Sequence, residues 1–290
     1  MVRLGDARAG FDAGRLNPTT RTVLAGAEML EGTPRRSQWL MVSKELSVMF
    51  LAALAYFAVR GLTEGSKADA LTNAYRIEDF ERWLGILVEP ELQNWITHST
   101  LLVNLVNWTY IWAHWPLIAV VAGWLILRHP EQYRLTRSAF LISGGLGLVV
   151  FATFPVAPPR LTDLDVVDTV TENSRAYRIL QPPAFTNQYA AMPSLHFGWN
   201  LLIGIAIFRV AGRMWVKTLA VLIPVAMGTA VVLTANHYIL DAVAGALFAL
   251  AGLWLAQLLR QRATERRRRK AEMEMRNEQA RLSEQVIADG

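Results

Sequence analysis

The sequence predicts an all-α fold: a polytopic membrane helix bundle with six transmembrane helices and additional amphipathic helices on its outer surface. Three observations support this class. Hydrophobic residues make up 53% of the 290 residues, which is above the usual share in soluble domains. Six apolar segments approach the roughly 17 to 25 residues that a helix needs to cross a bilayer. Lys and Arg gather at alternate ends of these segments, as in proteins with several spans.

The apolar segments follow one another through most of the chain. Lys44 and Glu45 interrupt the start of the first, and the second is longer than one crossing needs. We expect spans at residues 40–61, 99–127, 138–155, 192–208, 218–235 and 238–259. These divide the chain into an N-terminal arm (1–38), a membrane domain (39–260) and a basic, charged helical tail (261–290).

A polar segment between the first two spans has its own pattern. In residues 72–96 apolar side chains recur at helical spacing with acidic residues between them. They are Ile77, Phe80, Trp83, Leu84 and Leu87. We expect helices that lie on the outer membrane surface and pack over the bundle. A simple amphipathic connector is the open alternative.

Basic residues predict the orientation of the spans. Clusters follow the second span at Arg128, the fourth at Arg209 and the sixth at residues 260–270. Six alternating spans put all three clusters on one side, where the positive-inside rule locates the cytoplasm. Residues 62–97, on the other side, carry three Lys or Arg and seven Asp or Glu. Both termini are therefore predicted to be cytoplasmic, in an integral protein of the cell (plasma) membrane.

Composition limits the possible chemistry and partners. The chain has no cysteine, which excludes disulfides and thiolate chemistry. The formal net charge of +5 comes from basic residues beside the predicted spans, so we expect membrane lipids and no nucleic acid as partners. Residues 260–270 act as a topology signal or contact anionic lipid head groups. The sequence carries no signal for an oligomeric state.

Polar motifs mark the outer ends of three spans. "FPVAPPRL" (154–161) ends the third, "MPSLHFG" (192–198) begins the fourth and "NHYILDAVAG" (236–245) begins the sixth. Ionisable side chains at membrane depth are costly and usually functional. A bundle can bring these three ends together, which predicts a site on the extracytoplasmic side.

The residue types in these motifs suit phosphoryl transfer. His237 and Asp241 are four residues apart, so they share one helical face, and a carboxylate on one ring nitrogen makes the other a nucleophile or base. His196 suits a proton donor to a leaving oxygen. Ser194 lies in a helix first turn that favours phosphate, and Arg160 offers a planar partner for phosphate oxygens.

The motifs "PSLH" and "HYILD" resemble the second and third signatures of the type 2 phosphatidic acid phosphatase superfamily over about residues 95–260. The resemblance implies an integral membrane enzyme with a six-helix catalytic core and no metal or other cofactor. It also implies a lipid phosphate substrate, with a phosphohistidine intermediate on His237. Asp241 then orients His237, and His196 acts first as acid and later as base.

The chain departs from the usual signatures in each motif. Ala230 and Val231 stand where the third motif has Ser-Arg, and Leu195 stands where the second has glycine. Thr153 and Leu161 break the first motif and leave Arg160. These forms resemble the branch of inositol phosphorylceramide synthases, which transfer a phosphorylated head group to a lipid hydroxyl. Hydrolysis and head-group transfer, with water or an alcohol as acceptor, are therefore both expected.

Other hypotheses remain open at this stage. His196, His237 and Asp241 could instead ligate a metal, and bundle-facing histidines could move protons in a transporter. Tyr110, His114 and Tyr238 are candidates to line the pocket. His114 lies roughly 24 Å along the second span if that helix begins near residue 98, and about 10 Å if it begins near 107. If Arg160 does not bind the phosphate, Arg175 or Arg178 would.

Overall fold

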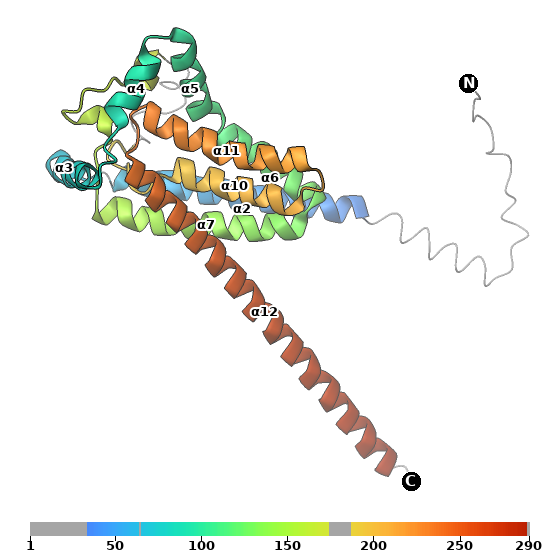
Figure 1. Cartoon of the computed structure of the whole chain (residues 1–290). Helices are drawn as coiled ribbons and strands as arrows, with labels where there is room; N and C mark the ends of the chain where they lie inside the picture. The colour runs from blue at the N-terminus through green and yellow to red at the C-terminus, as the bar shows by residue number, and fades with distance from the viewer. Residues whose placement is uncertain (1–33, 64, 174–186, 289–290) are drawn as a thin grey trace, which may run out of the picture. The chain divides into compact units, whose positions relative to one another are not determined.

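The computed structural model describes residues 34–63, 65–173 and 187–288, and these form helices joined by short loops (Figure 1). Among them the backbone contains one isolated bridge, between Val156 and Ala190, and no strand. The all-α expectation is confirmed for this part of the chain. In order, the α-helices are α2 (Pro34–Leu62), α3 (Lys67–Leu84), α4 (Glu89–Thr97), α5 (Thr100–Trp112), α6 (Trp115–Arg128), α7 (Pro130–Thr153), α8 (Thr169–Asn173), α10 (Leu195–Val210), α11 (Met214–Leu233) and α12 (Ile239–Ala288).

The chain divides into two compact units, Met1–Leu51 and Ala52–Gly290. The described part of the first unit is the beginning of α2. The second unit contains the end of α2 and all the other helices. Within it α10 packs against α7, α11 and α12, so α10 has bundle neighbours on several faces.

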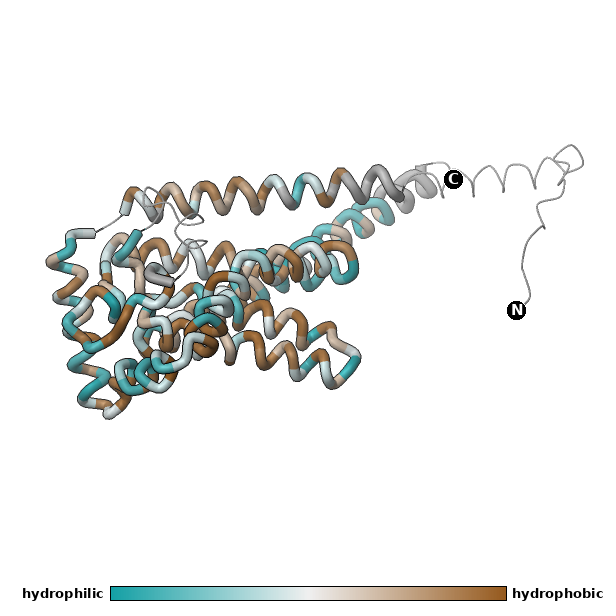
Figure 2. Tube along the Cα trace, turned by 90° about the horizontal axis from the view of Figure 1, so that it is seen from above, coloured by the Kyte–Doolittle hydropathy of each residue, from teal (hydrophilic) through white to brown (hydrophobic). Residues whose placement is uncertain are grey.

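Several helices are long and apolar enough to cross a membrane, and much of the helix bundle is hydrophobic (Figure 2). The C-terminal half of α12, from residue 260, is instead rich in charged residues. By length and composition four described helices qualify: α2, α7, α11 and α12. The pair α5–α6 makes five if it counts as one span, and α10, with 16 residues, is shorter. The protein is thus consistent with an integral membrane protein of four to five such helices.

The second predicted span is broken rather than continuous. Helices α5 and α6 meet at an angle of 47°, and His114 occupies the junction with φ −108° and ψ −99°. Pro116 follows in the first turn of α6. Proline has no N–H to donate to the carbonyl of residue 112, and its ring crowds that carbonyl, which favours a kink or break at this point. Non-helical backbone at membrane depth is tolerated where protein surrounds it or a cavity adjoins it.

Close contact between α10 and α12 depends on two glycines. A Cβ at Gly198 would meet the carbonyl oxygen of Gly245, and a Cβ at Gly245 would meet that of Ser194. Small residues allow helix backbones to approach in this way. The Ser194 N–H also donates to the Asp241 carbonyl at 2.8 Å. The first turn of α10 is therefore fixed against the first turns of α12.

Helices α3 and α4 lie at the end of the bundle where α11 ends and α12 begins (Figure 1). Their pattern buries a different face from the one that apolar spacing suggests. Ile77 is buried, whereas Phe80 and Trp83 are 48% and 77% exposed. The buried face instead carries Glu78 and Glu81. The carboxylates turn inward because each accepts a hydrogen bond near the start of α12: Glu81 from Leu240 N–H and Glu78 from the Tyr238 hydroxyl.

Candidate active site

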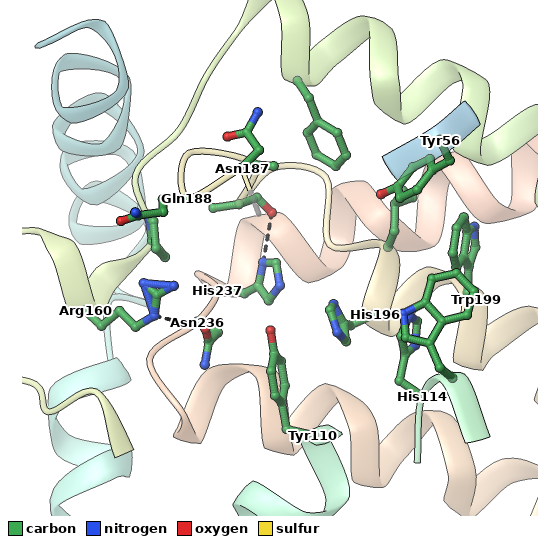
Figure 3. Close-up of a pocket in the computed structure, with 16 residues that line it drawn as sticks. Tyr56, Tyr110, His114, Arg160, Asn187, Gln188, His196, Trp199, Asn236 and His237 are labelled. Carbon is green, nitrogen blue, oxygen red and sulfur yellow. Dashed lines mark hydrogen bonds between the residues drawn. The ribbon is translucent and has the colours of Figure 1, made fainter. Parts of the chain in front are cut away.

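A small cavity lies where the three sequence motifs meet (Figure 3). Its volume is about 50 Å³, room for one or two water molecules. Five of the predicted site residues line it: Tyr110, His114, Arg160, His196 and His237. They come from the end of α5, the α5–α6 junction, the single 3₁₀ turn Pro159–Leu161, the first turn of α10 and the loop before α12. Segments far apart in the sequence thus supply one pocket.

His237 is held by two hydrogen bonds that fix its ring. Its backbone N–H donates to Val231 O at 3.1 Å, and Nδ1 lies 2.8 Å from Ala191 O (Figure 3). A carbonyl oxygen only accepts, so Nδ1 carries the proton. The other ring nitrogen, Nε2, is left with its lone pair. A lone pair on a positioned imidazole that lines a pocket is what a nucleophile or base requires.

Asp241 supports His237 less directly than the sequence suggested. Its Oδ2 lies 3.4 Å from His237 Nδ1, farther than the Ala191 oxygen, and accepts from Tyr238 N–H at 3.0 Å. Asp241 is completely buried. The carbonyl therefore sets the tautomer, and the carboxylate supplies a negative charge that stabilises a positively charged imidazole.

His196 faces His237 across the cavity. Their ring centroids are 6.1 Å apart. The His196 ring is stacked between two others, with Tyr110 at 4.6 Å and His114 at 4.1 Å. The two stacked rings fix the plane of the His196 ring. Of the two positions for His114 left open by the sequence, the structure has the one in the pocket.

Asn200 is a residue that the sequence analysis missed. Its Nδ2 donates to the His196 carbonyl at 2.8 Å and lies 3.3 Å from His114 Nδ1. The carbonyl requires the amide N–H₂ on this side, so His114 Nδ1 accepts and stays unprotonated. Asn200 thus positions both His196 and His114. The available signal in the sequence was an amide side chain four residues after His196 in an apolar helix. The structure shows that this side chain is fully buried.

Arg160 lies at the polar end of the pocket, beside Gln188 and Asn236 (Figure 3). Its Nε donates to Asn236 Oδ1 at 3.1 Å and lies 3.4 Å from Asp168 Oδ2. Among the described residues the Arg160 side chain donates its hydrogen bond through Nε, so the two Nη groups remain for a ligand. A guanidinium anchored at Nε presents its remaining donors in a fixed plane, as bidentate phosphate binding requires.

Three predicted site residues do not line the cavity: Asp241, described above, Ser194 and Tyr238. Ser194 is fully buried, and its hydroxyl accepts from Phe197 N–H as the N-cap of α10, so it contributes by starting the helix that carries His196. Tyr238 is fully buried, and its hydroxyl donates to Glu78 Oε1 at 2.8 Å. Arg175 and Arg178 lie outside the described residues.

Carboxylates from α3 and α4 cap the start of α12. Glu89 Oε1 accepts from Ile239 N–H at 3.1 Å, and Glu81 Oε1 accepts from Leu240 N–H at 2.7 Å. Both side chains are 0% exposed. Burial, followed by the neighbouring carboxylates, raises the pKa of Glu81 to about 9. Burial also raises the pKa of Glu89.

The described part of the chain contains no group of three or more His, Asp or Glu side chains that could hold a metal ion. The arrangement instead suits acid, base and nucleophile chemistry on an anionic group. One imidazole is held through Nδ1, a second lies with its ring centroid 6.1 Å away, and a guanidinium lies at the polar end.

Comparison with known proteins gives one match. The sequence model of a family described as the PAP2 superfamily matches residues 76–255, which include every site residue discussed above. No curated protein and no solved structure matches the chain.

Proposed function

The chain belongs to the PAP2 superfamily, whose members act on lipid phosphates, and on that premise we propose that it is a phosphatase or phosphotransferase with His237 as its nucleophile. One observation carries the proposal. His237 is held through Nδ1 by Ala191 O at 2.8 Å, with its Nε2 lone pair free, and its ring is 6.1 Å from that of His196. A phosphoryl group between the two rings would have a nucleophile on one side and a proton donor on the other.

The chemistry proceeds in two displacements. In the first, His237 Nε2 forms a bond to phosphorus while the bond between phosphorus and the leaving oxygen breaks. His196 gives its proton to that oxygen, and a phosphohistidine remains. In the second, an acceptor hydroxyl gives its proton to His196 and bonds to phosphorus as the phosphorus–nitrogen bond breaks. Both histidines return to their starting states.

The remaining residues bind and stabilise. The Nη groups of Arg160 bind the phosphate oxygens. They stabilise the negative charge that develops on these oxygens while the phosphoryl group is transferred. Asp241 stabilises the positive charge that develops on His237 when it bonds to phosphorus. Asn200 and His114 keep His196 in place.

The pocket's charge favours a phosphate with one negative charge. Of the described lining residues, Arg160 is the one with a permanent positive charge. Ala230 and Val231, where related motifs have Ser-Arg, are 1% and 0% exposed in α11. A phosphate monoester carries up to two charges near neutral pH, whereas a diester carries one. This supports the second candidate, transfer of a phosphorylated head group from a phosphodiester lipid to a lipid hydroxyl, as in inositol phosphorylceramide synthases.

We also propose that the chain crosses the cell membrane six times, with both termini in the cytoplasm and the pocket at the extracytoplasmic side. Support comes from the basic residues near Arg128 and Arg209 and in the segment 260–270, which fall on one side under this topology. The spans would be α2, the bent pair α5–α6, α7, α10, α11 and the first half of α12. A tag at residue 290 that was accessible from outside intact cells would contradict this topology.

The experiment that tests the function uses purified protein in detergent. It is offered a lipid phosphate monoester, or a phosphodiester lipid together with a lipid alcohol. Release of inorganic phosphate identifies a phosphatase, and a new phosphodiester lipid identifies a transferase. His237→Ala is the matched control and should form neither product. The absence of both products with the unaltered protein would contradict the proposed function.

A further inference from the structure

The first turn of α12 follows His237 directly and contains Asp241, so its position determines the geometry of both residues. The first N–H groups of any helix lack partners within the helix. Short local side chains normally cap them. Here only the first cap is local: Asp241 Oδ2 accepts from Tyr238 N–H at 3.0 Å. The next two come from other helices: Glu89 of α4 and Glu81 of α3, at 3.1 and 2.7 Å.

Both glutamates are fully buried, and ionised carboxylates are buried only at a high energetic cost. Arg82, which follows Glu81 in the sequence, is exposed and pairs with Asp79 at 2.7 Å, so it does not neutralise them. The further charged neighbour of the pair is Asp241 on α12, which adds a carboxylate rather than a positive charge. Glu78 on α3 accepts from the Tyr238 hydroxyl. Helices α5 and α11, which pack against α4, contain no Asp or Glu.

One oxygen of each glutamate is left over. Glu81 Oε2 and Glu89 Oε2 are buried with no hydrogen-bond partner among the described residues. The two side chains are close enough to bond to each other. A carboxylate only accepts, whereas a protonated carboxyl group also donates. One proton held between the two groups therefore satisfies both oxygens and removes one of the two negative charges.

The same surface helix reaches the other support of His237. Ala70, Ala74 and Ile77 of α3 pack in one cluster with Ala191 and Tyr238. Ala191 provides the carbonyl that holds His237 Nδ1. Helix α3 thus packs in one cluster with the residue whose carbonyl holds the His237 ring and with the residue that follows His237 in the sequence.

We propose that Glu81 and Glu89 are positioning residues, which hold the first turn of α12, and with it His237 and Asp241, through one shared proton. The catalytic consequence rests on the proposed function; the cap itself does not. Loss of the shared proton places two buried negative charges side by side next to Asp241. Their repulsion separates α3 and α4 from α12, so the enzyme loses activity at alkaline pH.

The test combines substitutions with two measurements on the full-length protein. Glu81→Gln keeps the acceptor for Leu240 N–H and supplies a permanent donor to Glu89. It should retain at least half of kcat at neutral pH and lose less activity than the unaltered protein at alkaline pH. Glu81→Ala and Glu89→Ala should each lower kcat at least tenfold, with KM changed less than threefold. The double Gln variant should also lose activity, because two amide donors then face each other.

Hydrogen exchange provides a reading that needs no activity. In Glu81→Ala and Glu89→Ala the amides of residues 238–242 should exchange at least tenfold faster. Glu91→Gln, an exposed residue on the same helix as Glu89, is the matched control and should change neither measurement. If the Ala variants do not fold, the two single Gln variants and their pH profiles decide.

Two results would overturn the inference: unchanged exchange and kcat in the Ala variants, or a Glu81→Gln variant with the same pH profile as the unaltered protein. An unaltered protein without phosphatase or transferase activity would overturn the proposed function instead. The exchange rates at residues 238–242 would still test the cap.

Discussion

The Glu81→Gln substitution should change how the stability of the folded protein depends on pH. Burial raises the pKa of Glu81 from 4.5 to about 9. Between these two values the folded protein holds a proton that the unfolded chain has released. The resulting stability is fully present below pH 4.5 and is lost as the pH rises towards about 9. Glutamine does not titrate, so the variant lacks this dependence.

The magnitude follows from the pKa difference. A proton bound by the folded state alone changes the free energy of unfolding by about 1.4 kcal/mol per pH unit. From pH 6 to pH 8 the unaltered protein should therefore lose about 3 kcal/mol more than Glu81→Gln. At roughly 2 to 4 °C per kcal/mol for a domain of this size, the melting temperatures should diverge by about 6 to 12 °C.

Thermal unfolding in one detergent, followed by tryptophan fluorescence at pH 6, 7 and 8, measures this divergence. Glu91→Gln should give a curve parallel to that of the unaltered protein, because residue 91 is exposed. A Glu81→Gln curve that is also parallel would refute the reasoning. It would mean that Glu81 releases its proton at an ordinary pH in the folded protein.

Other substitutions test the site itself. Arg160→Ala should lower kcat/KM about 10- to 150-fold, the effect of losing a charged hydrogen bond of about 1.5 to 3 kcal/mol; unchanged kinetics would remove Arg160 from the phosphate site. Asp241→Asn should lower kcat by a similar factor while the fold persists in melting curves, because a carbonyl already fixes the His237 tautomer. His114→Ala should lower kcat about two- to tenfold by removing a ring stacked on His196, and His114→Phe should restore most of it; equal losses would show that stacking is not its role.

Local spacing predicted the central residues of the site. His237 and Asp241 share a helical face four residues apart, and His196 stands at the start of an apolar helix, so both features depend on a few neighbouring residues. The structure keeps them together, but Ala191 O lies nearer to His237 than Asp241 does. That carbonyl is 46 residues away along the chain, and no local pattern indicates it.

The depth of His114 depended on where the second span breaks. Hydropathy treats residues 99–127 as one apolar run, since Trp115 and Pro116 do not lower it enough to divide it. Pro116 cannot donate the hydrogen bond that would continue α5, which favours a break there. Proline alone does not determine the break, since α11 continues through Pro224.

The role of the acidic residues in α3 and α4 was hidden for a different reason. Periodicity identifies an amphipathic helix but assumes that its apolar face is the buried one. Glu81 and Glu89 bond to N–H groups 159 and 150 residues later in the chain. Partners at such separations arise only from the packing of the bundle. Tyr238 was predicted to line the pocket because its partner is equally distant in the sequence: its hydroxyl bonds to Glu78, 160 residues earlier.

The most direct test of the account is to trap the phosphorylated enzyme. Protein incubated briefly with a lipid substrate labelled on phosphorus, then denatured in alkali, should carry an acid-labile label on the peptide that contains His237. His237→Ala should carry no label and form no product, whereas His196→Ala should slow label formation, least for substrates whose leaving group needs no proton. Full activity in His237→Ala, or a label on a different residue, would contradict the central claim.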